Sequence, residues 1–297
     1  MAPRIAVVGS ANMDLVGLAE RLPAPGETVL GDDFMMTPGG KGANQAIASA
    51  RAGGECTFLG AIGSDSFGVT INARLTASGV NTGKVRTSYG PSGVAVIMVD
   101  HAGENSILVS PGANRTFTGL TDDEKAAIAG ADVLICQQEI PVSTVIEAAR
   151  AARDGGTRTV LNAAPARPLP AELLELVDLL VVNEVEARAV TGTPEQDMDA
   201  LLDAVPRVVL TLGGAGAWYA DREGRSERIP AYPVEVVDTT AAGDAFCGAL
   251  AVAWGEGRDI LDAVRWATAA GAACVRRVGA YPSLPTRADI DALYRTA

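Results

Sequence analysis

Histidine, aromatic residues and positive charge are all scarce in this sequence. Its 297 residues contain one histidine, His101, which argues against catalytic triads, Cys-His pairs and histidine-rich metal sites. Aromatic residues make up 4% of the chain, so few side chains are left to build an aromatic pocket for a nucleobase. The net charge of −12 argues against a nucleic-acid or anionic-membrane partner. A polyanion such as ATP stays possible, because helix dipoles and metal ions set the potential of a local site.

The sequence also lacks long apolar runs and closely spaced cysteines. No stretch is long and apolar enough to span a bilayer, and the N-terminus leads into a short apolar strand rather than a signal peptide. The four cysteines, which include no C-x-x-C pair, are Cys56, Cys136, Cys247 and Cys274. This spacing predicts reduced thiols rather than a zinc site or disulfides, and hence a cytoplasmic protein.

Hydrophobic residues make up 48% of the chain, and short apolar runs alternate with longer helical patterns. Strands are predicted over 5–8, 57–61, 133–136, 159–162, 179–182 and 208–212. Helices are predicted over 43–52, 144–153, 184–190, 244–254, 260–276 and 287–294. This alternation is typical of a mostly parallel central sheet with helices on both faces. We therefore expect residues 1–297 to form a single α/β domain.

Two segments interrupt the alternation. Residues 15–38 are rich in proline, glycine and acidic residues, and 93–109 has the pattern of an antiparallel hairpin. Such a hairpin could form a small sheet that covers a site at the carboxyl ends of the main strands. An ordinary surface hairpin is the alternative, and periodicity does not separate the two.

The segment from Asp238 to Asp244 carries the strongest functional signal. It combines a turn, small residues and a second carboxylate directly before an apolar helical run. This arrangement offers backbone N–H groups and the positive end of a helix dipole to an anion, with the Asp244 carboxylate beside it. Phosphoryl transfer to an alcohol requires both, because a base takes the hydroxyl proton while N–H groups stabilise the moving phosphoryl group.

A second glycine-rich segment, from Pro38 to Ala46, opens a predicted helix. Its glycines permit close backbone approach, and Lys41 and Asn44 are donors on the first turn, which favours ligand binding. It is not a Walker A loop, because no Ser or Thr follows the lysine. Upstream, Asn12 and Asp14 follow the first strand and can direct polar groups onto one small ligand, although both types are common in turns.

Four further segments carry weaker signals. Segment 137–141 ends a strand, and its carboxylate, Glu139, can bind a hydroxyl or cap a helix. Asn183 and Glu186 lie at a helix start, where they can assist Mg²⁺ through water or act as a cap. The glycine-rich turn 211–217 can let a nucleotide approach, with a plain hairpin turn as the alternative. Segment 271–283 is a small-residue helix followed by a loop.

Taken together, these segments resemble the ribokinase-like carbohydrate kinases, a family that also holds fructokinases and adenosine kinase. The matching stretches run in the family's order from Gly9 to Ser283, and 39–44 and 238–244 are the most specific. Segments 93–114 and 161–166 favour the ribokinase branch. The resemblance implies a ribokinase-like α/β fold with a small β-sheet lid, formed by about 11–38 and 91–113, which closes over the sugar and pairs two subunits.

The resemblance also implies a role for each matching residue. Sugar binding is implied for Asn12, Met13, Asp14, Gly40, Lys41, Gly42, Ala43, Asn44 and Glu139. Asp244 would be the base, and Ala241, Ala242 and Gly243 would form the anion hole. The ATP site would contain Asn183, Thr211, Leu212, Gly213, Gly214, Ala215, Gly216, Gly243 and Thr268, with Glu186 assisting Mg²⁺ through water. A monovalent-cation site for K⁺ would use Asp238, Thr240, Cys274, Arg277, Gly279 and Ser283.

Three positions depart from the family's pattern. Thr268 stands where some ribokinases have histidine, so a direct adenine contact by this residue is doubtful. Ala164 replaces the more usual proline of its segment, and Ala241 takes a place often held by glycine. None of these changes removes a group needed for the chemistry.

The implied activity is ATP-dependent phosphorylation of D-ribose at its 5-hydroxyl, which gives D-ribose 5-phosphate and ADP. The nearest alternative is a family kinase acting on deoxyribose, fructose or a nucleoside such as adenosine, since one hydroxyl contact can change the preference. An inactive sugar-binding regulator would tolerate loss of Asp244 or the anion hole, yet both remain. A dinucleotide-binding oxidoreductase is disfavoured, because the first strand is not followed by G-x-G-x-x-G.

Overall fold

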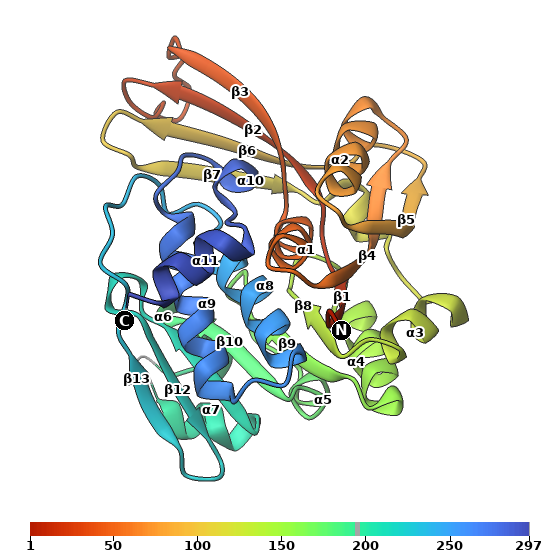
Figure 1. Cartoon of the computed structure of the whole chain (residues 1–297). Helices are drawn as coiled ribbons and strands as arrows, with labels where there is room; N and C mark the ends of the chain where they lie inside the picture. Colours follow the sequence, from red (N-terminus) through yellow and green to blue (C-terminus); the bar gives the residue numbers. More distant parts are fainter. Residues whose placement is uncertain (194–196, 297) are drawn as a thin grey trace.

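The computed structural model of the chain describes residues 1–193 and 197–296. Its main sheet contains β1 (Arg4–Val8), β4 (Glu55–Gly63), β5 (Asn81–Ser88), β8 (Val133–Cys136), β9 (Arg158–Asn162), β10 (Leu179–Asn183), β11 (Arg207–Thr211), β12 (Ala217–Asp221) and β13 (Ser226–Ile229). Their order is β13-β12-β11-β10-β9-β8-β1-β4-β5 (Figure 1). Neighbours from β11 to β5 run parallel, and β12 and β13 add an antiparallel hairpin at one edge.

Side chains of the central strands alternate between two hydrophobic cores, because successive residues of a strand point to opposite faces. In β1, Ile5 and Val7 belong to one core and Ala6 and Val8 to the other. The first core is covered by α1 (Lys41–Arg51), α2 (Ser66–Ala77), α8 (Ala242–Gly255), α9 (Ile260–Cys274) and α11 (Arg287–Tyr294). The second is covered by α3 (Asp122–Ala129), α4 (Val142–Gly155), α5 (Ala171–Leu174), α6 (Glu184–Thr191) and α7 (Met198–Ala204). The predicted fold, a mostly parallel sheet with helices on both faces, is confirmed.

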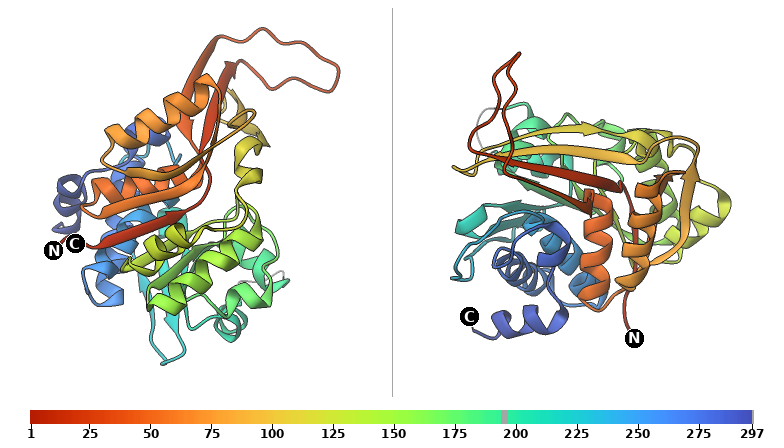
Figure 2. Two further views of the ribbon diagram at one scale, coloured as in Figure 1. Left: turned by 90° about the vertical axis from the view of Figure 1, so that its right-hand side faces the viewer. Right: turned by 90° about the horizontal axis from the view of Figure 1, so that it is seen from above.

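A second sheet contains β2 (Asn12–Ala19), β3 (Asp33–Gly39), β6 (Gly93–Asp100) and β7 (Asn105–Ser110), in the order β3-β2-β6-β7. At its base Asn12 pairs with Gly39 on one side and with Gly93 on the other. The loop 20–32 between β2 and β3 extends away from the rest of the molecule (Figure 2). The predicted lid segments, about 11–38 and 91–113, contain these strands, and their closure over a site stays a prediction.

The second sheet also exposes large apolar side chains. They are Phe34, Met35, Met36, Val96, Met98, Ile107, Leu108 and Val109. The strand pairing places Phe34, Met36, Val96, Met98 and Leu108 on one face of the sheet and Met35, Ile107 and Val109 on the other. Apolar side chains grouped on one exposed face are typical of an interaction site. No helix within the described ranges, 1–193 and 197–296, has the length and hydrophobicity needed to cross a membrane.

Every strand and helix predicted from the sequence is present, with ends shifted by a few residues, and the hairpin 93–109 forms β6 and β7. The elements that the sequence did not reveal include α2, α3, α5, α7, β5, β12, β13 and the small-sheet strands β2 and β3. Strand β5 lies at the edge of the main sheet, where a polar composition is tolerated. Its Lys84 and Arg86 form ion pairs with Asp123 and Glu124 of α3. Polar edge strands lack the apolar alternation on which the prediction depends.

Candidate active site

The predicted site residues gather at the carboxyl edge of the main sheet. Parallel strands place their carboxyl ends together, and open α/β sheets bind ligands in the crevice outside those ends. Segments that follow β1, β8, β9, β10 and β11 reach this edge. The first turns of α1 and α8 meet there too, because Asn44 of α1 donates a hydrogen bond to Asp244 of α8. Residues 200 positions apart thus share one site.

Helix α8 begins directly after a residue with left-handed backbone geometry. Ala241 has a φ of 61°, the only positive φ outside glycine in the described part of the chain. This conformation costs an alanine about 1 kcal/mol, so the surrounding structure must impose it. The first turn of a helix carries N–H groups without intrahelical acceptors. Space beside this turn is open, since a Cβ on Gly243 would meet no atom within 4 Å. This open space fits the anion hole predicted at 241–243, and the Ala242 N–H within it already donates to the Thr239 carbonyl at 3.2 Å.

The Asp244 carboxylate is buried in the first turn of α8, with 7% of the residue exposed. Its Oδ2 accepts a hydrogen bond from Asn44 Nδ2 at 3.0 Å, and its Oδ1 accepts one from Gln45 Nε2 at 2.9 Å. Burial raises the pKa of Asp244, while Lys41 and the two amides partly oppose the rise. A carboxylate with a raised pKa holds a proton more strongly than one in water, which suits a general base.

Lys41 lies among carboxyl groups that are buried, as in Asp244 and Glu186, or half-buried, as in Glu139. Burial alone would lower the pKa of Lys41, but three acidic groups outweigh it and raise the pKa above its ordinary value. These groups are Asp244, Glu139 and Glu186. Burial also raises the pKa of Asp14 to about 7, with the charges of Glu139 and Asp244 adding to the effect. One cation among four carboxyl groups leaves many hydrogen-bond acceptors for the hydroxyl donors of a small ligand.

The glycines before α1 let this segment pass very close to the start of β2. A Cβ on Gly39 would lie 2.0 Å from Asp14 Oδ2. A Cβ on Gly40 or Gly42 would lie 2.8 Å or less from the backbone of residues 9–12. Gly40 also has a φ of 90°, which side chains rarely tolerate. Any larger residue would separate the polar groups that the two segments bring together.

Asn12 and Glu139 are held by residues outside the predicted set. Asn12 Oδ1 accepts a hydrogen bond from Asn114 Nδ2 at 2.7 Å. Glu139 Oε2 accepts hydrogen bonds from Ser10 Oγ at 2.5 Å and from the Lys41 N–H at 3.1 Å. Glu139 therefore caps α1 while it contributes charge to the site. The two roles that the sequence allowed for it, helix cap and hydroxyl ligand, are compatible.

Met13 and Ala43 support the site through packing. Both belong to the hydrophobic core that α1 and α8 cover. The Ala43 N–H donates to the Ser10 carbonyl at 2.8 Å, which joins α1 to the loop after β1. These residues fix the positions of their polar neighbours, and their own side chains face the core.

Asn183 and Glu186 form a capping box at the start of α6. The Asn183 side chain accepts hydrogen bonds from the Val185 and Glu186 N–H groups, and the Glu186 carboxylate accepts one from the Asn183 N–H. Burial raises the pKa of Glu186, partly offset by the Asn183 N–H and by Lys41. Glu186 thus serves as a helix cap and also lies within electrostatic range of Asp244.

The turn from Thr211 to Gly216 follows β11, and residues 213–215 form a short 3₁₀ helix, η2. A Cβ on Gly213 or Gly214 would meet no atom within 4 Å, so this surface is open. Gly216 differs, because a Cβ there would lie 2.0 Å from the Ile229 carbonyl. The turn joins β11 to the antiparallel β12, as a hairpin turn does, and Leu212 pairs with Gly216 through its N–H.

Thr268 lies in the middle of α9, on its buried side. Its hydroxyl donates to the Val264 carbonyl at 2.9 Å, one turn earlier in the same helix. The hydroxyl therefore already has a partner within α9, which fits the sequence-based doubt about an adenine contact at this position.

The six residues predicted for a monovalent cation come from two segments that lie against each other, the loop 238–240 and the stretch from the end of α9 through residue 283. The Asp238 carboxylate accepts hydrogen bonds from the Thr240 N–H at 2.8 Å and from the Gly279 N–H at 2.7 Å. The Cys274 thiol lies 3.6 Å from the Thr240 carbonyl and 3.1 Å from the Ser283 hydroxyl, beside α10 (Ala280–Ser283). Carbonyl, hydroxyl and carboxylate oxygens suit a hard cation. The Arg277 guanidinium instead points to Asp289 at 3.4 Å. The described residues contain no cluster of three or more His, Cys, Asp or Glu side chains placed to hold a metal.

Sequence reasoning missed several buried polar residues of the site. Gln45 is fully buried and binds Asp244, and Asn162 and Gln137 bind Gln45. Asn114, in the 3₁₀ helix η1 (Gly112–Thr116), holds Asn12. Each of these residues lies in a segment that was singled out, but a buried polar residue cannot be recognised without knowing which positions are buried.

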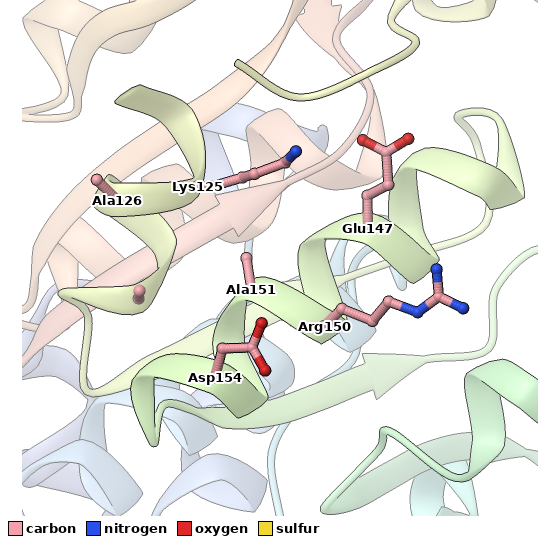
Figure 3. Close-up of a pocket in the computed structure, with 7 residues that line it drawn as sticks. Lys125, Ala126, Glu147, Arg150, Ala151 and Asp154 are labelled. Carbon is pink, nitrogen blue, oxygen red and sulfur yellow. The ribbon is translucent and has the colours of Figure 1, made fainter. Parts of the chain in front are cut away.

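A surface cavity between α3 and α4 lies apart from this site. None of the predicted site residues lines this cavity. Its lining includes Lys125, Ala126, Glu147, Arg150, Ala151 and Asp154 (Figure 3). Arg150 forms an ion pair with Glu172, and Glu147 accepts the Leu120 N–H at 2.8 Å. The charged groups at this cavity thus include ordinary surface pairs.

The fold and the site together define a class: an α/β protein with an anion-binding helix terminus beside a buried carboxylate, which is the arrangement of a phosphotransferase acting on an alcohol. Comparison with known proteins gives the family. The pfkB family of carbohydrate kinases matches residues 2–287. The chain therefore belongs to the pfkB family of carbohydrate kinases, as the resemblance in the sequence predicted.

Individual relatives agree with this assignment. The chain is 40% identical to the ribokinase of Bacillus subtilis, over 97% of this chain and 98% of that protein. It is also 40% identical to a bifunctional ribokinase/ribose-5-phosphate isomerase A of Fructilactobacillus sanfranciscensis, and it spans 55% of that longer protein. Among solved structures, ribokinase of Arabidopsis thaliana complexed with ribose and ATP has a TM-score of 0.93 at 35% identity, with 100% of both chains covered.

Proposed function

We propose that this chain catalyses ATP-dependent phosphorylation of D-ribose at O5, with D-ribose 5-phosphate and ADP as products. The observation that carries the proposal is the position of Asp244, buried at the open amino end of α8 and held there by two amides of α1. A base and an anion site lie side by side, as transfer of a phosphoryl group to a hydroxyl requires. Its similarity to ribokinases over nearly its full length supports ribose as the sugar.

In this proposal the sugar lies between the start of β2 and the start of α1. Asn12, Asp14, Lys41, Asn44 and Glu139 bind its hydroxyl groups, and Gly40 and Gly42 allow its close approach. Asp244 takes the proton of the attacking 5-hydroxyl. Residues 241–243 stabilise the charge on the transferred phosphoryl group through their N–H groups. Most of the rate acceleration then comes from alignment and charge stabilisation, with proton removal contributing about 10²–10⁴-fold.

ATP is proposed to bind along Asn183, the turn 211–216 and Thr268, with its γ-phosphate at Gly243. The open space beside Gly213, Gly214 and Gly243 fits this placement, because a nucleotide needs backbone that no side chain covers. Asn183 and the turn follow neighbouring parallel strands, β10 and β11, so they lie at adjacent positions along one edge.

Two metal ions are part of the proposal. Bound Mg²⁺ would neutralise charge on the ATP phosphates, and Glu186 would assist it through water, since a buried carboxyl with a raised pKa gains from a nearby cation. K⁺ would bind at the loops that contain Asp238 and Ser283, whose donor set is rich in oxygen. This site adjoins residues 241–243 in the chain, so the ion would stabilise the geometry of the anion hole without touching the sugar.

We further propose that the four-stranded sheet acts as a lid and joins two subunits in a homodimer. Exposed apolar side chains on one face of this sheet, such as Phe34, Met36 and Leu108, support this assignment, because burying them against a second copy would remove them from water. The four free cysteines are all buried as thiols, which agrees with the proposed cytoplasmic location.

The test is ADP release by the purified protein with Mg²⁺-ATP and a panel of ribose, deoxyribose, fructose and adenosine, each with and without K⁺. The expected result is a strong preference for ribose and activation by K⁺. Preference for another acceptor would reassign the sugar pocket while leaving Asp244 as the base. Absence of turnover with every acceptor, in protein shown to be folded, would overturn the proposed activity and favour a sugar-binding regulator.

A further inference from the structure

Gln45 occupies the centre of a buried network that none of the roles assigned above explains. Its side chain is fully buried in α1, one residue after Asn44. Its Nε2 donates to Asp244 Oδ1 at 2.9 Å and to Asn162 Oδ1 at 3.1 Å. Its Oε1 accepts a hydrogen bond from Gln137 Nε2 at 2.6 Å. All hydrogen-bonding groups of this amide are thus used, and each partner comes from a different element.

The chemistry of Asp244 determines the direction of this network. An ionised carboxylate only accepts hydrogen bonds, so the Gln45 atom that faces it must be the NH₂ group. That orientation leaves the Gln45 carbonyl oxygen to face Gln137, which must then donate. Gln137 packs closely against Gly9, where a Cβ would lie 2.0 Å from its Oε1, and that buried Oε1 has no hydrogen-bond partner among the described residues. The orientation of Gln45 is therefore determined at the Asp244 end, and the donor role of Gln137 follows from it.

Asn162 contributes the second constraint on the same NH₂ group. It closes β9, and its own Nδ2 donates to the Val181 carbonyl of β10 at 3.4 Å. The Gln45 amide is therefore anchored to the main sheet, while its other proton points to Asp244. Asn44, the second donor to Asp244, is held less firmly, since its buried Oδ1 has no hydrogen-bond partner among the described residues.

We propose that Gln45 is a positioning residue, which fixes the rotamer of the Asp244 carboxylate and favours its ionised form. This inference rests on the proposed role of Asp244 as the base. Gln45 has no place in the proposed contacts with sugar or ATP, so it acts on the reaction only through Asp244. Both of its effects follow from one hydrogen bond, because a donor to a carboxylate stabilises the charged form and also restricts its orientation.

The experiment compares Gln45→Met with wild type in the pH dependence of kcat and of kcat/KM for the preferred sugar. Methionine keeps the length and volume of the side chain and removes both amide groups. We expect the acidic limb of the profile to move upward by about one pH unit, because the charged carboxylate loses a donor. We also expect kcat to fall by about 10- to 100-fold at neutral pH, with KM for the sugar changed much less.

Gln138→Met is the matched control. Gln138 is also buried; its Nε2 donates to the Ala163 carbonyl at 2.9 Å and its Oε1 accepts from Arg167 Nε at 2.8 Å, and neither partner is Asp244. Its variant should lose comparable stability and leave the acidic limb in place. The proposal would be overturned if the acidic limb of Gln45→Met lay at the same pH as in wild type and its kcat were no lower than that of Gln138→Met.

A third variant keeps the test decisive if Gln45→Met does not fold. Gln137→Met frees the Gln45 carbonyl without touching Asp244 and should shift the acidic limb in the same direction by a smaller amount. A shift in the opposite direction, or none, would count against the network. Failure of the proposed function looks different, because wild type itself would then show no sugar-dependent ADP release, or Asp244→Asn would retain turnover.

Discussion

Two buried aspartates, at the carboxyl and amino edges of the same sheet, differ sharply in how their charge is compensated. Asp244 is 7% exposed and Asp221, at the end of β12, is 3% exposed. Asp221 accepts hydrogen bonds from the Tyr219 hydroxyl at 2.8 Å, from Arg225 Nε at 2.7 Å and from two backbone N–H groups. Burial alone would raise the pKa of Asp221, but these bonds outweigh it and lower the pKa.

Asp244 has only two neutral amides as partners, and the nearby Lys41 is shared with other carboxylates. Burial therefore prevails and its pKa is raised. The comparison shows that burial does not by itself decide what a carboxylate does. A fully paired buried aspartate stabilises the fold, whereas an incompletely paired one is available to take a proton.

The largest expected effect comes from Asp244→Asn. The substitution keeps the shape and removes the base, so kcat should fall by about 10³-fold or more, while sugar and ATP still bind. Steady-state ADP release and calorimetric titration with sugar measure the two quantities. Turnover within a few-fold of wild type would show that Asp244 is not the base, and the contrast drawn here between Asp244 and Asp221 would no longer hold.

Asp221→Asn should have the opposite profile. It removes a carboxylate that holds Arg225 and Tyr219, so the free energy of unfolding should fall by about 1–3 kcal/mol. Turnover per folded molecule should stay near wild type, because Asp221 lies at the far edge of the sheet. Urea unfolding and ADP release, measured on the same preparation, separate stability from catalysis. Loss of turnover in fully folded protein would contradict the division between the two edges.

Gly39→Ala tests another incompletely paired carboxylate, Asp14. The new methyl group would lie 2.0 Å from Asp14 Oδ2 and must displace it, so KM for the sugar should rise by roughly tenfold. Gly17→Ala, in the same sheet, is the matched control, since a Cβ there meets no atom within 4 Å. Equal effects of the two substitutions would show that strand flexibility, rather than the Asp14 contact, is responsible.

Asp14→Asn gives the smallest expected effect, and it concerns stability. The pKa of Asp14 is raised to about 7 from an ordinary value of 3.8, so the folded state binds more protons than the unfolded state between these values. Its contribution to stability is therefore present at low pH and lost as the pH rises through about 7. Asparagine removes this loss, and Tm at pH 8 should rise by about 2–4 °C, although sugar binding weakens. At pH 4 the two proteins should unfold at similar temperatures, and a larger gain there than at pH 8 would contradict the assignment.

The sequence was sufficient to predict the six central strands of the main sheet and the helices α1, α4, α6, α8, α9 and α11, because those strands are buried on both faces and read as continuous apolar runs. It was insufficient for β5 and for the small-sheet strands β2 and β3, where polar edge residues or one-sided exposure weaken the pattern. For the site, the segments around Asp244 and Lys41 were identified from turn chemistry and small residues. Gln45, Gln137 and Asn162 were not given roles, since their importance depends on contacts between residues about a hundred or more positions apart, such as Gln45 and Asp244.

The junction between the two sheets couples mechanics to binding. The chain leaves β1 for β2 at Asn12 and returns from β3 to α1 at Gly39, and Asn12 pairs with Gly39 and Gly93 at that junction. A rotation of the small sheet would therefore displace Asn12 and Asp14 themselves, rather than merely uncover them. With the sugar site proposed above, a substitution far out on the small sheet that shifts its orientation would change the fraction of protein able to bind sugar, and the apparent sugar affinity would change in proportion to that fraction.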